Sequence, residues 1–174
     1  MFSDCENIIS IDLSFFDSSD INDTSSMFMN CIHLEKIDFS SFETKNVTNM
    51  NNMFYNCNNL KNINLSFFNT KNVKDMNCMF SKCYNLKDLY LSSFDTQNVT
   101  NMSNMFSNCQ NLVYLDLSSF DTRKVEYMSY MFDKCYSLIF VNISSFIIYN
   151  EYSLNNVFNN CYNLTNIDLS CVYK

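Results

Sequence analysis

A 26-residue repeat runs through the chain of 174 residues and constrains its fold more than any other feature. Six copies are full length and open on a Met-Phe pair, and a shorter seventh copy opens on Val-Phe. Repeats of this length are typical of solenoids, in which one unit forms one turn and buries its apolar face against its neighbours. We call each turn a rung and number the repeat positions 1 to 26 from its first residue. The seven rungs begin at Met1, Met27, Met53, Met79, Met105, Met131 and Val157.

Apolar residues recur at positions 1, 2, 5, 8, 11, 13, 16, 21 and 24, and they follow two different spacings. Positions 11 and 13 flank a polar residue, as in Ile63-Asn64-Leu65, and this alternation predicts a short strand with one buried face. Positions 21, 24, 1, 2 and 5 lie on one helical face, which predicts a helix of about two to three turns. Thr48 and Thr100 are expected to cap these helices at their N-termini.

The apolar residues keep strict register from rung to rung, which argues against a disordered Asn-rich chain. One unit cannot bury its own apolar face, whereas stacked units can. We therefore expect residues 1–174 to form a single solenoid domain of about seven rungs, with the alternative that the chain is one piece of a longer array.

The pattern MFxxCxxLxxLDLSSFDTxNVTNM resembles the BspA-like leucine-rich-repeat surface proteins in their 26-residue variety. Residues 105–131, MFSNCQNLVYLDLSSFDTRKVEYMSYM, carry this pattern, as do residues 79–104, and the resemblance covers essentially the whole chain. It implies an α/β, leucine-rich-repeat-like solenoid with parallel strands on the concave side and short helices on the convex side. It also implies a cell-surface or secreted protein that acts in adhesion and protein binding, and it brings no catalytic residues.

Three features depart from the family's pattern. No leader peptide is visible, which makes a cytoplasmic location the alternative to the cell surface. Neither end carries a polar capping repeat, so we expect end-to-end association through the terminal rungs. Rung 6 carries FIIYNEYSL in place of FDTxNVTNM, which puts Ile147, Ile148 and Tyr149 where polar turn residues lie elsewhere.

One cysteine per rung occupies position 5, and four interpretations are open for it: metal ligand, disulfide partner, reactive thiol or packing residue. A zinc site needs cysteines or histidines that converge on one point, whereas these residues are spread along a line. Helices that pack about 8–10 Å apart are too far apart for a disulfide. We therefore expect buried, free thiols that act as small apolar side chains. The position-5 residues are Cys5, Cys31, Cys57, Cys83, Cys109, Cys135 and Cys161; Cys78 and Cys171 lie off this column.

Composition narrows the function classes. The net charge of −7 argues against nucleic-acid binding, which needs a basic patch, and no apolar run is long enough to span a membrane. There is no glycine, so turns with positive φ must use Asn, Asp or Ser, and the usual phosphate-binding loops cannot be built. His33 is the only histidine, and the acidic segment around Asp17, Asp20 and Asp23 lacks the glycine and the terminal glutamate of an EF-hand. We expect no enzyme activity, cofactor or metal.

Positions 10, 12 and 14 point away from the core along each predicted strand and form an outward face that is mostly polar and acidic. Three aromatic residues interrupt it in consecutive rungs, which suits a binding patch because aromatic side chains are favoured interface anchors. Isolated exposed aromatics are also ordinary in a chain with this many of them. We expect a non-enzymatic module that binds a protein or cell-surface ligand, with a structural spacer as the alternative. The candidate binding residues are Tyr90, Tyr114, Phe140, Asp88, Asp116 and Asn142.

Overall fold

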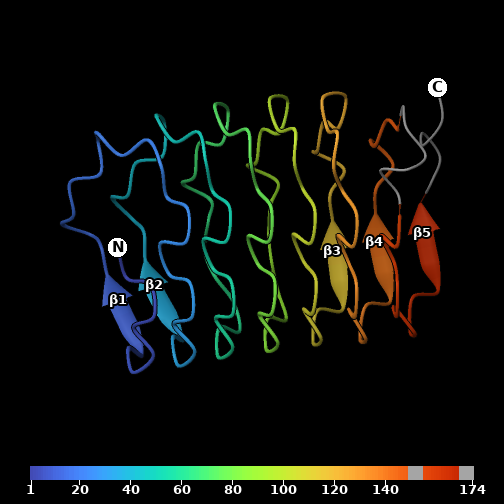
Figure 1. Ribbon diagram of the computed structural model, residues 1–174, viewed down its shortest axis with the longest axis horizontal. Coiled ribbons are helices and arrows are strands. Elements are labelled where there is room, and N and C mark those ends of the chain that lie inside the picture. Colours follow the sequence, from blue (N-terminus) through green and yellow to red (C-terminus); the bar gives the residue numbers. More distant parts are fainter. Residues whose placement is uncertain (149–154, 169–174) are drawn as a thin grey trace.

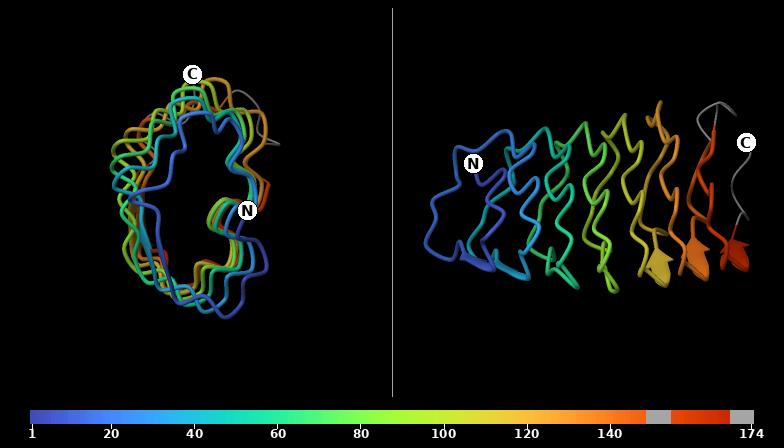
Figure 2. Two further views of the ribbon diagram at one scale, coloured as in Figure 1. Left: turned by 90° about the vertical axis from the view of Figure 1, so that its left-hand side faces the viewer. Right: turned by 60° about the horizontal axis from the view of Figure 1, so that its bottom comes forward.

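The computed structural model describes residues 1–148 and 155–168, so Tyr149 and Cys171 lie outside the described residues. The rungs lie side by side along one axis in the order of the sequence, as the colours of Figure 1 show. Seen end-on, they nearly superpose as one elongated ring (Figure 2). This is the repeat stack that the 26-residue period predicts.

Short parallel strands form one face of the stack, which we call the strand face (Figure 2). Two sheets are present: β1 pairs with β2, and β3, β4 and β5 pair in that order. Partner residues are 26 apart, as in Ser10 with Lys36 and Tyr114 with Phe140. Between the sheets, Asn62 and Asp88 form an isolated parallel bridge. The strands are β1 Ser10–Asp12, β2 Lys36–Asp38, β3 Tyr114–Asp116, β4 Phe140–Asn142 and β5 Asn166–Asp168.

The expected convex helices are wrong: the described part of the chain contains no helix. In the segment that the apolar spacing assigned to a helix, alternate backbone N–H groups bond to the next rung. Met50 N donates to Asp75 O at 2.9 Å, and Phe54 N donates to Met79 O at 2.9 Å. The N–H groups between them close tight turns within the rung, as in Met53 N to Met50 O at 3.3 Å. Successive turns thus reproduce the three-residue apolar spacing of a helix without its continuous i→i−4 bonds.

Positive φ angles explain why a helix cannot form here. They fall at positions 26 and 4, as in Asn52 (φ 55°) and Asn56 (φ 62°), and a left-handed residue interrupts a right-handed helix. Asn and Asp tolerate this region better than most residues, which agrees with the expected use of Asn, Asp and Ser in a chain without glycine. Other residue types adopt it too. The positive-φ residues are Asp4, Ser26, Asn30, Asn52, Asn56, Cys78, Lys82, Asn104, Asn108, Tyr130, Lys134, Asn156 and Asn160.

The predicted N-caps at Thr48 and Thr100 are wrong for the same reason, because no helix follows them. Both residues instead connect rungs. The hydroxyl of Thr48 donates to Asn22 O at 3.3 Å, and that of Thr100 donates to Lys74 O at 3.2 Å. Their backbone N–H groups bond to the same two carbonyls, each at 2.8 Å.

The core is continuous along the stack and is organised in columns. The position-2 phenylalanines stack ring on ring, with 5.5 Å between the centroids of Phe28 and Phe54 and an interplanar angle of 2°. The same stacking extends from Phe2 to Phe158. Leu60 and Leu86 at position 8 are fully buried, as the apolar pattern predicts.

A buried polar column at position 18 has no counterpart in the apolar pattern. Thr44, Thr70, Thr96 and Thr122 are each 1% exposed. The hydroxyl of Thr96 donates to Asp121 O at 3.0 Å and accepts the N–H of Asp121 at 2.8 Å. Each threonine thereby bonds to both backbone groups of a turn residue in the next rung, which is what allows its hydroxyl to be buried.

Candidate functional site

The position-5 cysteines are packing residues. All described cysteines are free, and Cys31, Cys57, Cys83, Cys109 and Cys135 are buried, as expected. From Cys31 to Cys161, each thiol in the column donates to the position-2 carbonyl of the preceding rung, as in Cys57 Sγ to Phe28 O at 3.1 Å. Burial raises the pKa of Cys83 to about 12 and those of Cys57 and Cys109 well above their usual value. A buried thiol that stays protonated is a poor nucleophile and a poor metal ligand.

The remaining chemical candidates are turn residues or exposed side chains. Asp17 Oδ1 accepts Ser19 N at 3.0 Å, and Asp23 Oδ1 accepts Ser25 N at 2.7 Å, so the acidic segment closes turns. His33 is exposed. Within residues 1–148 and 155–168, no three His, Cys, Asp or Glu side chains gather closely enough to hold a metal ion.

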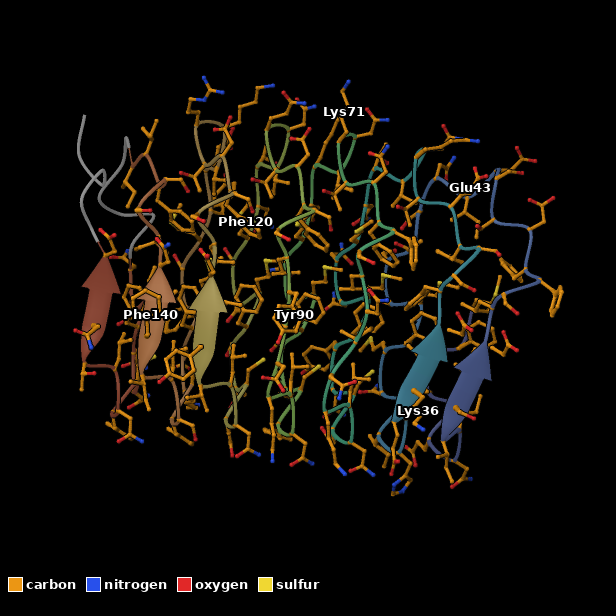
Figure 3. All side chains as sticks on the ribbon, turned by 180° about the vertical axis from the view of Figure 1, so that it is seen from behind. Lys36, Glu43, Lys71, Tyr90, Phe120 and Phe140 are labelled. Atoms are coloured by element: carbon orange, nitrogen blue, oxygen red, sulfur yellow. The ribbon has the colours of Figure 1, made fainter. Side chains whose placement is uncertain are left out.

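The structure brings four of the six candidate residues together on the strand face. Tyr90, Tyr114, Phe140 and Asp116 line one depression of about 350 Å³, whose floor includes Leu89 and Leu115. Tyr90 is 77% exposed and Tyr114 is 62% exposed, so both rings present large apolar surfaces to solvent. Tyr114 and Phe140 are direct partners in the β3–β4 pairing. Figure 3 shows Tyr90 and Phe140 at the level of the strands, whereas Lys71 projects from the far edge of the rungs.

The other two candidates flank this depression. Asp88 lines an adjoining depression of about 280 Å³, and Tyr90 belongs to both. Asn142 pairs with Asp116 in the β3–β4 register, but it does not line the depression.

A local turn fixes most side chains at position 12. Asp12 Oδ1 accepts Ser14 N at 2.8 Å, and Asp116 Oδ1 accepts Ser118 N at 2.9 Å. Asp38, Asn64 and Asn142 make the same bond. Hydrogen bonds from the side chain and the backbone N–H of Ser14 lower the pKa of Asp12, because they stabilise its charged carboxylate. Rung 4 carries Tyr90 at this position, and a tyrosine has no short side-chain oxygen for this turn.

Sequence reasoning missed a third depression, of about 520 Å³, across rungs 1 to 3 of the strand face. Asp12, Lys36, Asp38 and Phe67 are among the residues that line it. Phe67, which is 58% exposed, was the available signal, because most other rungs carry serine at position 15.

None of the described residues forms a helix long and apolar enough to cross a membrane.

Comparison with solved structures confirms the resemblance to leucine-rich-repeat proteins. A T. pallidum leucine-rich-repeat protein matches with a TM-score of 0.62 and 20% identity, over 91% of this chain and 68% of that one. A Bacteroides ovatus leucine-rich-repeat protein matches with a TM-score of 0.44 and 18% identity, over 99% of this chain and 61% of that one. A Faecalibacterium prausnitzii leucine-rich cell-surface protein matches with a TM-score of 0.36 and 16% identity, over 97% and 60%. The chain therefore spans about two thirds of these proteins or less.

A search of curated protein sequences found no match. A family model described as "Mycoplasma protein of unknown function, DUF285" matches residues 1–90 and 62–171. The two matches overlap and together cover nearly the whole chain. The chain belongs to the DUF285 family, and its fold is similar to that of a leucine-rich-repeat protein.

Proposed function

We propose that this chain is a non-enzymatic binding module that engages a protein or cell-surface ligand through its strand face. One observation carries the proposal: three aromatic rings from consecutive rungs surround a single depression, and those of Tyr90 and Tyr114 are exposed while that of Phe140 is half-buried. Large exposed aromatic surfaces gathered around a hollow are typical of interaction sites. Asp116 lines the same depression, and its carboxylate favours partners with positive charge over partners with negative charge.

The rigidity of the stack supports the same proposal. The aromatic rings stand on backbone that is bonded to the neighbouring rungs, as in the β3–β4 pairing beneath Tyr114 and Phe140. A rigid platform loses little conformational entropy when it binds. A surface or adhesion role, as implied by the sequence resemblance, would place this platform where a host or cell-surface ligand can reach it.

The test replaces the aromatic rings and measures binding to intact cells. Tyr90→Ser with Tyr114→Ser is expected to lower the binding of labelled protein at least tenfold, since interface anchors carry about 2 kcal/mol or more. Tyr127→Ser is the matched control, because Tyr127 is 59% exposed, much like Tyr114, but belongs to a different bridge ladder.

Circular dichroism and urea unfolding would establish that both variants keep the fold. Equal binding by the wild type and the folded double variant would remove the strand face as the contact surface. The structural-spacer alternative predicts that no variant of any face changes binding.

A further inference from the structure

The three depressions on the strand face form one groove. The depressions of about 520 and 280 Å³ share Asn62 and Asn64, and those of about 280 and 350 Å³ share Tyr90 and Ser92. Ile37, Ile63, Leu89 and Leu115 lie along its floor, at position 11 of successive rungs. We call this continuous hollow, from Asp12 in rung 1 to Phe140 in rung 6, the strand-face groove.

The length of the groove suits an extended polypeptide. Parallel strands lie about 4.8 Å apart, so the five steps from rung 1 to rung 6 span about 24 Å. An extended chain advances about 3.3 Å per residue and covers that distance with about seven residues. Asp38, Asp88 and Asp116 along the groove are exposed, so a segment inside a longer protein can enter it from the side.

The charge of the groove selects among possible segments. Five carboxylates line it, against the single ammonium of Lys36. None of the five belongs to an ion pair within the part of the chain that the structure describes. The turn bonds at Asp12, Asp38 and Asp116 hold three of them in fixed orientations at intervals along the groove. The carboxylates are Asp12, Glu35, Asp38, Asp88 and Asp116.

The aromatic end of the groove favours the same chemistry. The faces of Tyr90 and Tyr114 attract cations through the ring quadrupole, and arginine also stacks on such rings. Asp88 and Asp116 lie beside these rings. A neutral apolar segment would satisfy the rings but leave the carboxylates desolvated and unpaired, and an acidic segment would be repelled.

We propose that the strand-face groove binds an extended basic segment of a partner protein, with Arg or Lys side chains seated between the carboxylates and the rings of Tyr90 and Tyr114. This inference rests on the proposed function and adds the chemistry of the partner. The backbone of the segment crosses the floor of the groove, and its cationic side chains alternate along Asp38, Asp88 and Asp116.

The experiment uses three heptapeptides of the form Ser-X-Ser-X-Ser-X-Ser, in which X is arginine, citrulline or glutamate. Citrulline keeps nearly the shape of arginine but is neutral, because a carbonyl oxygen replaces one of the terminal NH2 groups. Tyrosine fluorescence and NMR chemical shifts of the full chain report binding. We expect the arginine peptide to bind about tenfold or more tightly than the citrulline peptide and to shift the Tyr90 and Tyr114 resonances, while the glutamate peptide does not bind.

Two charge variants separate site binding from general attraction to a protein with a net charge of −7. Asp88→Asn with Asp116→Asn removes two charges inside the groove, and Asn preserves the turn at position 12, as Asn64 and Asn142 show. Asp17→Asn with Asp20→Asn removes two exposed charges outside it. The first pair is expected to weaken arginine-peptide binding about tenfold, and the second is expected to leave it within about twofold.

Equal affinities for the arginine and citrulline peptides, equal losses in the two charge variants, or no binding of the arginine peptide would each overturn the basic-segment proposal. Those results leave the proposed function standing if Tyr90→Ser with Tyr114→Ser still abolishes binding to cells. If cell binding survives that variant as well, the proposed function also fails.

Discussion

At the scale of single residues, Tyr90 is the most informative position in the chain. Position 12 carries Asp or Asn in every other rung, and at five of these residues the side chain closes a turn with the N–H of position 14. Rung 4 gives up that bond and exposes a large ring in its place. Tyr90 thus lacks a stabilising bond that most other rungs make at position 12. A residue of this kind is expected where function, and not stability, determines the residue type.

Tyr90→Asn is therefore expected to raise stability and to lower binding. The new amide oxygen can accept the N–H of Ser92, and a net intramolecular hydrogen bond contributes about 0.5–1.5 kcal/mol. Urea unfolding should show a higher midpoint with an unchanged slope, while binding to cells falls. The reverse change in the neighbouring rung, Asn64→Tyr, removes the bond that Ser66 N donates to Asn64 Oδ1 and should lower the midpoint. A fall in stability for Tyr90→Asn would show that the ring contributes to the fold.

At the scale of the element, the segment from position 21 to position 5 shows where inference from the sequence fails. Apolar residues three apart predicted a helix, because a helix is the commonest structure with that period. Successive tight turns give the same spacing, and apolar positions alone do not distinguish the two. The residues at positions 26 and 4 held the distinguishing signal, since Asn recurs there at positive φ. The strand prediction held in five rungs, because period-two alternation has few structural alternatives. It was wrong for Ile63-Asn64-Leu65, since rungs 3 and 4 form only the isolated bridge between Asn62 and Asp88 at this level.

The threonine column is the second feature that the pattern could not predict, because a polar residue in a turn is ordinarily solvated. Thr96→Val keeps the shape but removes the partner of both the N–H and the C=O of Asp121. We expect a loss of about 1–3 kcal/mol, since two backbone groups of the half-buried Asp121 lose their partner. Urea unfolding of the purified chain measures this loss.

Thr96→Ser and Thr100→Val are the matched controls for Thr96→Val. Serine keeps the hydroxyl and should recover most of the loss. Thr100 is partly exposed, and its hydroxyl serves a carbonyl that the backbone N–H of Thr100 also reaches, so Thr100→Val should lose no more than about 1 kcal/mol. A loss of the same size at Thr96 and Thr100 would contradict a special role for the buried column.

At the scale of the whole molecule, contacts between identical side chains in successive rungs stabilise the stack. The position-2 phenylalanines, the position-5 thiols and the position-18 threonines each touch only the adjacent rungs, so stability is a sum over neighbours. The period and the core positions could be read from the sequence because each is repeated up to seven times. The strand-face groove could not, because it arises from irregular residues such as Phe67 and Tyr90. End-to-end association of residues 1–174 stays a prediction, which sedimentation over a range of concentrations tests.

The thiol column is expected to make the whole stack less stable as the pH becomes alkaline. Burial raises the pKa of Cys83 to about 12 and those of Cys57, Cys109 and Cys135 well above 9.0, so the folded chain keeps protons that the unfolded chain releases. The stabilisation is fully present below pH ~8 and is lost as the pH rises through ~9 toward the folded pKa values.

At pH ~9.5 each thiol lowers the free energy of unfolding by about 0.8 kcal/mol relative to neutral pH. Burial also raises the pKa of Cys31 and Cys161 to about 11. Urea unfolding from pH ~7 to ~9.5 should therefore show a loss of about 5 kcal/mol over these six thiols. Cys83→Ala with Cys109→Ala lowers stability at every pH but should reduce the dependence on pH by about a third, because it removes two of the six column thiols with a raised pKa. An unchanged slope in that variant would mean that the thiols are not the groups responsible.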